Sequence, residues 1–203
     1  MALTDKLKAI ADAIREKTGK TNELTLDEMP AEIASIETGG SGATEPYIEE
    51  TYDADGNLIN ANMVGYTKIR EGAFYNCYNL SLTSLPDGVT SIGNEAFAGC
   101  SNLALTSLPD GVTSIGNYAF VDCSNLALTS LPDGVTTTRS YAFYNCSKLT
   151  TITFKGTPSS ILTGAFGNCS NLTTINVPWA EGEVANAPWG ATNATINYNY
   201  TGE

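Results

Sequence analysis

The chain has 203 residues, with 22 acidic and 10 basic side chains and a formal net charge of −12. This charge repels phosphate backbones and anionic lipid, which argues against nucleic-acid and membrane-surface binding. The sequence has no histidine, which excludes Ser-His and Cys-His nucleophile pairs and every His-ligated metal site.

Residues 1–36 predict a short N-terminal α-helical segment. The apolar residues of its first half recur at helical spacing, between an N-cap at Thr4 and a terminating Gly19. A second short helix follows, which begins either at the capping box that opens with Thr25 or later, at Pro30. Helices this short are not stable alone, so they must pack on each other, on the rest of the chain or on further copies.

Residues 37–46 are rich in glycine and predict a flexible linker, and residues 47–62 predict a hairpin that caps the first of the coils that follow. The sequence Asp-Ala-Asp-Gly at 53–56 favours a tight turn. It also resembles the start of a calcium loop, but an EF-hand needs glycine at its sixth position and glutamate at its twelfth. Those positions are Leu58 and Val64, so we favour the plain turn.

Residues 63–178 carry a repeat of 23 residues, which is the most specific feature of the sequence. The repeated positions hold Phe74, Phe97, Phe120, Phe143 and Phe166; Cys77, Cys100, Cys123, Cys146 and Cys169; and Leu80, Leu103, Leu126, Leu149 and Leu172. Isoleucine stands five residues before phenylalanine, except in the fourth repeat, where Thr138 replaces it. A fixed step of this length predicts a solenoid whose coils stack and share one core.

Alternating β-branched residues at 149–154 and 172–177 predict strands of a parallel sheet. The recurring sequence Leu-Pro-Asp-Gly, at 85–88 and twice more, predicts the turn after each strand. Residues 179–203 predict a degenerate last coil that shields the end of the stack. In this coil Trp189 takes the place of Phe166, the strand is 195–200, and Ile175 and Val177 correspond to Tyr198 and Tyr200.

The sequence NLALTSLPDGVTSIGNYAFVDC at 102–123 resembles the BspA-type leucine-rich repeat, a unit of 23 residues with Ile-Gly, Ala-Phe and Cys at these offsets. The resemblance implies a mainly β protein, a leucine-rich-repeat solenoid with parallel strands, preceded here by the short helical segment. Repeats of this kind are interaction scaffolds with many partners, so the resemblance names no ligand. Residues 1–36 with the linker resemble the N-terminal segment of phage and prophage tail-associated proteins that carry such repeats.

Two rows of side chains, the cysteines and three aspartates, have the chemistry of metal ligands. The five cysteines are an odd number without a Cys-x-x-Cys pair, and we predict buried free thiols and no metal or other cofactor. Asp87, Asp110 and Asp133 stack along the turn edge, where either water and salt screen their charges or a cation lies between them.

Two sets of side chains are candidates for binding. Tyr75, Tyr118, Tyr141 and Tyr144 occupy positions that vary between repeats, and exposed tyrosine suits adaptable recognition; the alternative is that these rings only cover an apolar edge. The second set is Leu82, Leu105 and Leu128, which form an exposed stripe on the sheet unless the chain bends there. We favour the bend, which turns the leucines inward and Thr83, Thr106 and Thr129 outward.

These observations predict a non-enzymatic binding protein. Our first hypothesis is a phage or prophage tail-fibre-like receptor-binding protein, which recognises a bacterial surface protein or glycan and assembles with itself, for example as a trimer, through residues 1–36. The alternative is a bacterial leucine-rich repeat adhesin or general protein-interaction module. The N-terminus lacks the pattern of a secretory signal, so we expect synthesis in the bacterial cytoplasm and a place in a virion tail. An enzyme would need carboxylates such as Glu49 and Glu50 in a cleft.

Overall fold

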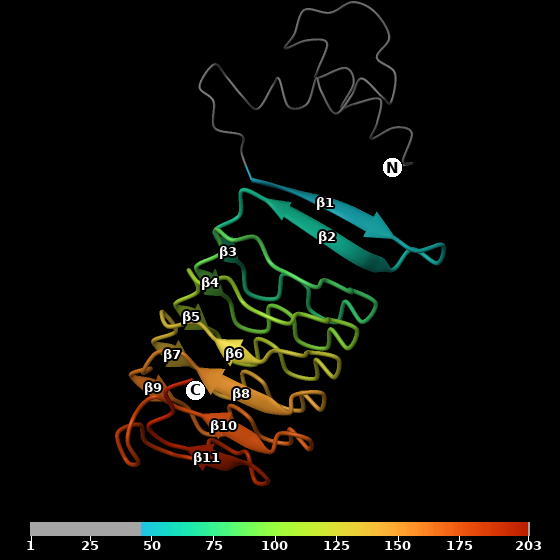
Figure 1. Cartoon of the computed structure of the whole chain (residues 1–203). Helices are drawn as coiled ribbons and strands as arrows, with labels where there is room; N and C mark the ends of the chain where they lie inside the picture. Colours follow the sequence, from blue (N-terminus) through green and yellow to red (C-terminus); the bar gives the residue numbers. More distant parts are fainter. Residues whose placement is uncertain (1–45, 203) are drawn as a thin grey trace, which may run out of the picture. The chain divides into compact units, whose positions relative to one another are not determined.

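The computed structural model describes residues 46–202, which form a solenoid of parallel strands with an antiparallel hairpin at its N-terminal end (Figure 1). The helices predicted within residues 1–36, the linker up to residue 45, and Glu203 lie outside the described residues. Between residues 46 and 202 the chain forms no helix with the length and apolar surface that spanning a bilayer requires.

The hairpin consists of β1 (Tyr47–Tyr52) and β2 (Leu58–Val64), paired antiparallel. Its turn is closed by the Asp53 carboxylate, which accepts hydrogen bonds from the backbone N–H groups of Asp55, at 3.0 Å, and Asn57, at 2.8 Å. The Asn57 side-chain amide also donates to this carboxylate, and these bonds lower the pKa of Asp53. The predicted tight turn is therefore confirmed. Residues Ala61 and Met63 of β2 are buried against the first coil.

Two parallel sheets run along the solenoid. The first sheet contains β3 (Lys68–Ile69), β4 (Ser91–Ile92), β5 (Ser114–Ile115), β7 (Thr137–Thr138) and β9 (Ser160–Ile161) in that order. The second contains β6 (Ser130–Leu131), β8 (Thr151–Phe154), β10 (Thr174–Asn176) and β11 (Thr195–Asn197). In the first sheet each residue pairs with the residue 23 positions later, so the predicted repeat sets the register.

The core is built from rows of identical side chains. The five repeated phenylalanine rings stack with centroids 5.2–5.4 Å apart and planes within 4–10° of parallel. From the second coil on, the cysteine thiol donates a hydrogen bond to the phenylalanine carbonyl of the preceding coil, as from Cys100 Sγ to Phe74 O at 3.0 Å. The repeated leucines are fully buried. The residues that share the 23-residue period therefore form the core, as predicted.

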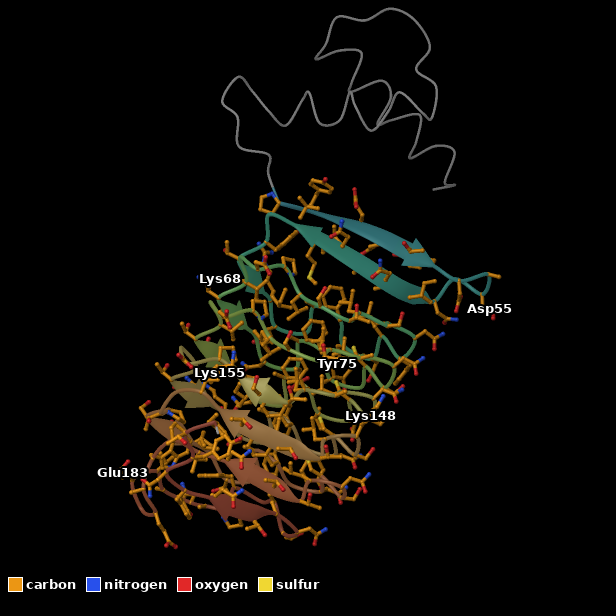
Figure 2. All side chains as sticks on the ribbon, viewed as in Figure 1. Asp55, Lys68, Tyr75, Lys148, Lys155 and Glu183 are labelled. Carbon is orange, nitrogen blue, oxygen red and sulfur yellow. The ribbon has the colours of Figure 1, made fainter. Side chains whose placement is uncertain are left out.

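The last coil departs from the predicted correspondence. Ile175 pairs with Ile196, a step of 21 residues, so the correspondence of Ile175 and Val177 with Tyr198 and Tyr200 is wrong. Trp189 is buried but packs beside Phe154 and Trp179, at centroid distances of 6.1 and 6.3 Å. Figure 2 shows Asp55 at the tip of the hairpin and Glu183 in the last coil, at opposite ends of the stack.

Thr138 interrupts the buried isoleucine row of the first sheet. Its side chain is fully buried, and its hydroxyl oxygen has no hydrogen-bond partner within the described residues. A buried hydroxyl that has lost its water without gaining a partner destabilises the folded state.

We therefore expect Thr138→Val to raise the free energy of unfolding by about 1–2 kcal/mol, because it keeps the shape and removes the unpaired hydroxyl. Urea unfolding followed by circular dichroism measures the change. The matched control is Thr113→Val, since the Thr113 hydroxyl donates to the Thr90 carbonyl at 3.1 Å. That variant gains no stability, and equal stabilisation of both variants would contradict the explanation.

Candidate binding surface

Two positions in each of the five repeats have a left-handed backbone, and one of them carries two of the candidate tyrosines. The residues before Ala-Phe are Gly72, Glu95, Tyr118, Tyr141 and Gly164, with φ of 62°, 52°, 55°, 57° and 76°. Glycine adopts this conformation freely, whereas a bulky side chain there costs about 1–2 kcal/mol. Tyr118 and Tyr141 therefore stand where the backbone disfavours them.

These two tyrosines form a cluster with Tyr144, here called the tyrosine cluster. Tyr118 and Tyr141 stack with centroids 5.3 Å apart and planes 9° from parallel, and Tyr144 meets Tyr141 edge-on at 5.6 Å. The exposed fraction is 40% for Tyr118 and 37% for Tyr141, and Tyr144 is half-buried. The structure thus brings three of the four candidate tyrosines together.

The next coil makes room for these rings with glycine. A Cβ at Gly164 would lie 2.6 Å from Cε1 of Tyr141, and one at Gly167 would lie 2.9 Å from Cδ2 of Tyr144. The rings thus lie directly over the backbone of the next coil, which fixes their orientation. The tyrosine cluster is held in place by its surroundings and still reaches solvent.

Tyr75 lies apart from the tyrosine cluster, in the first coil, and is 54% exposed. Beside it Tyr78, which the sequence reasoning missed, is 56% exposed. The same row holds serine in every later repeat, at Ser101, Ser124, Ser147 and Ser170. A comparison of this row between repeats would have singled out Tyr78.

The leucine stripe does not exist. Leu82, Leu105 and Leu128 are buried, with exposed fractions of 6%, 0% and 1%, and Thr83, Thr106 and Thr129 are exposed. The favoured bend is thus confirmed, and the assignment of these leucines to a binding surface is wrong. The physical reason is that the chain turns at Thr-Ser, which lets the leucines on both sides of the turn, such as Leu105 and Leu108, enter the core.

A lysine lies beside the aspartate row. Lys155 Nζ lies 3.7 Å from Oδ1 of Asp110, in a hollow that Asp87 also lines. Both side chains are well exposed, so the pair contributes little to stability. Nowhere in residues 46–202 do three or more His, Cys, Asp or Glu side chains form a group able to hold a metal ion.

Four of the five cysteines are buried free thiols, and Cys77 is half-buried. Burial raises the pKa of Cys100 to about 12 and that of Cys169 to about 11, and it raises the pKa of Cys146 well above its usual range. The prediction of buried thiols is therefore wrong for Cys77. Within the described residues the hairpin precedes the first coil, and Phe74 is the first phenylalanine of the sequence, so no phenylalanine carbonyl of an earlier coil accepts its thiol hydrogen.

Comparison with known proteins places these features in a family. Residues 67–186 match the model of the "BspA type Leucine rich repeat region" with 6 copies. The chain is similar to the crystal structure of a leucine-rich repeat protein from T. pallidum, with a TM-score of 0.54 and 25% identity, covering 76% of this chain and 80% of that one.

Two further crystal structures match less closely. A leucine-rich repeat protein from Bacteroides ovatus has a TM-score of 0.38 and 22% identity, covering 68% of this chain and 47% of that one. A leucine rich cell surface protein from Faecalibacterium prausnitzii has a TM-score of 0.34 and 24% identity, covering 68% of this chain and 56% of that one. No curated protein sequence gives a significant match.

Burial predicts the order in which the thiols react. In the native protein at about pH 8 we expect a thiol reagent to modify Cys77 alone, because the other thiols are buried and hydrogen-bonded, whereas Cys77 is half-buried. Mass spectrometry of timed samples gives the site and the rate. Cys77→Ser should remove the fast reaction, and global unfolding should release the remaining four. Rapid modification of Cys123 or Cys146 in the native state would contradict the core assignment.

Proposed function

Since the chain belongs to the BspA-type leucine-rich repeat family, we propose that it is a non-enzymatic, adhesin-like binding protein that contacts its partner through the tyrosine cluster. The partner we propose is a component of a bacterial surface. More specifically, we propose that it is a phage or prophage tail-fibre-like receptor-binding protein.

The backbone conformation of Tyr118 and Tyr141 is the observation that carries this proposal. Glycine occupies the same position in the first and fifth coils, so the fold accepts glycine there. Two adjacent coils instead hold exposed tyrosines at an energetic cost to folding. A residue that strains its backbone and leaves its ring in solvent is best explained by binding, and tyrosine is enriched among residues that dominate binding energy.

The carboxylates considered for catalysis do not support an enzyme. Glu49 and Glu50 are neighbours on β1, and successive side chains of a strand point to opposite faces. Glu49 accepts a hydrogen bond from Asn62 at 2.8 Å, and Glu50 accepts one from the Tyr52 hydroxyl. Paired-carboxylate hydrolysis needs both groups on either side of one bond, which this arrangement does not provide.

Residues 1–36 supply the support for the tail-fibre role. Their resemblance to the N-terminal segments of phage tail-associated proteins leads us to propose that they attach or oligomerise the chain, while residues 47–203 present the binding surface. The rival role, a free-standing adhesin or general interaction module, uses the same tyrosine cluster and needs no oligomer.

Replacing both strained tyrosines separates binding from folding. Asparagine tolerates the left-handed conformation, so we expect Tyr118→Asn with Tyr141→Asn to fold with equal or slightly higher stability and to bind at least about tenfold more weakly. Fluorescently labelled protein titrated onto a panel of bacterial cells measures binding, and thermal unfolding checks the fold. The matched control is Glu95→Asn, at the same position of the second coil, which should bind like the original chain. Undiminished binding by the double variant would remove the tyrosine cluster from the proposal.

Solution mass tests the role of residues 1–36. If they oligomerise the chain, light scattering gives a multiple of the 21.4 kDa chain mass for the full chain and a monomer for residues 47–203. A monomer in both cases favours the free-standing adhesin. An oligomer in both would place the self-association in the solenoid, contrary to the proposal.

A further inference from the structure

A hollow of about 440 Å³ lies beside the first sheet, where β4 and β5 end. Its floor is Gly93 and Gly116, which follow these strands directly. A Cβ at Gly93 would lie 2.5 Å from the backbone nitrogen of Glu71, and one at Gly116 would lie 2.5 Å from that of Asn94. The coils approach too closely there for any side chain, so two consecutive coils leave the surface open.

An arginine also lines the hollow, at the position equivalent to these two glycines. The same position of the fourth repeat is Arg139, which lines the hollow. Arg139 is exposed, and within residues 46–202 no carboxylate lies within ion-pair distance of it, whereas Lys155 is paired with Asp110. The hollow thus presents an unpaired guanidinium, a group whose planar donors fit a carboxylate in a bidentate manner.

Hydroxyl and amide groups line the rest of the hollow. The hydroxyls of Ser91 and Ser114 make no hydrogen bond to another described residue, although those of the preceding Thr90 and Thr113 each donate to a carbonyl of the previous coil. These serine hydroxyls recur once per coil, about 4.8 Å apart, and both are open to a ligand.

Another side of the hollow is lined by asparagine side chains that are linked by hydrogen bonds. Asn94 Nδ2 donates to Glu71 Oε2 at 3.3 Å, and the Asn117 backbone N–H donates to Asn94 Oδ1 at 2.9 Å. The Asn117 side-chain oxygen ends this chain and accepts no hydrogen bond from the described residues. Tyr118 of the tyrosine cluster follows Asn117 directly in sequence, so the hollow adjoins the proposed binding surface.

We propose that this hollow binds an acidic sugar of a surface glycan, with the sugar carboxylate on Arg139 and the sugar hydroxyls on Ser91, Ser114 and Asn117. The proposal rests on the proposed function and names the chemical class of its ligand. The single free guanidinium matches one carboxylate, and the uncharged donors and acceptors match a polyhydroxylated ring. Glu71 at the far end accepts from hydroxyl groups and repels further anions. A dense polyanion such as polyphosphate therefore does not fit.

The test uses the full chain and three soluble probes: sialyllactose, which carries one carboxylate, the uncharged lactose, and polyphosphate. Isothermal titration calorimetry should show binding of sialyllactose and neither of the others. Arg139→Gln should weaken this binding about tenfold to a hundredfold, the effect of removing a hydrogen-bonding partner of a charged group. Asn117→Ala should weaken it less. The matched control is Arg70→Gln, at the same position of the first repeat and outside the hollow, which should bind normally. Galacturonic acid, which also carries one carboxylate, provides a second acidic sugar.

The outcomes separate this inference from the proposed function. If the Tyr118→Asn, Tyr141→Asn variant loses cell binding and the original chain binds neither acidic sugar, the sugar site is overturned and the binding function stands. Binding of sialyllactose that Arg139→Gln does not weaken also overturns it, as does equally tight binding of polyphosphate. If acidic sugars bind through Arg139 but the protein binds no cells, the proposed function fails and the sugar site remains. Competition by sialyllactose against cell binding supports both.

Discussion

Each coil of this protein is held in register by the coil before it. Backbone hydrogen bonds join equivalent residues of neighbouring coils, the phenylalanine rings of those coils stack, and the cysteine thiol donates a hydrogen bond to the preceding phenylalanine carbonyl. A buried carbonyl accepts this thiol in four successive coils, which explains why a small residue with a weak donor repeats at that position. Both sheets keep the same 23-residue register as far as β10, and the step to β11 falls to 21 residues.

The register that builds the core also aligns the residues that face solvent. Because every position repeats one coil later, a substitution in adjacent coils produces a continuous surface feature. Two tyrosines in succession form a stacked pair, and two glycines in succession form a hollow. The same regularity shapes what this surface offers chemically: its groups repeat in rows, which suits binding to extended partners, and the described carboxylates do not gather into a metal site.

The departures from the predicted structure lie where the regular environment is interrupted. The alternation of inward and outward side chains applies to a straight strand, so it did not decide whether Leu105 faces the core or solvent. The bend at Thr106 places Leu105 in the core. The 23-residue step assumes a coil on both sides, so it failed at Cys77, which follows the hairpin, and in the strand containing Ile196, which ends the second sheet. Hydrophobic spacing identifies the buried rows and says less about the ends, where different neighbours pack.

The sequence by itself determined the repeat, the identity of the buried rows and the hairpin turn, because a period of 23 residues allows only equivalent positions to stack. Only the tertiary structure decided the backbone conformation and the close packing of the variable side chains. That Tyr118 and Tyr141 share a left-handed backbone depends on the turn geometry, and that Gly93 and Gly116 leave a hollow beside Arg139 depends on how closely the coils approach. These features arise from contacts between coils, which spacing along one chain does not encode.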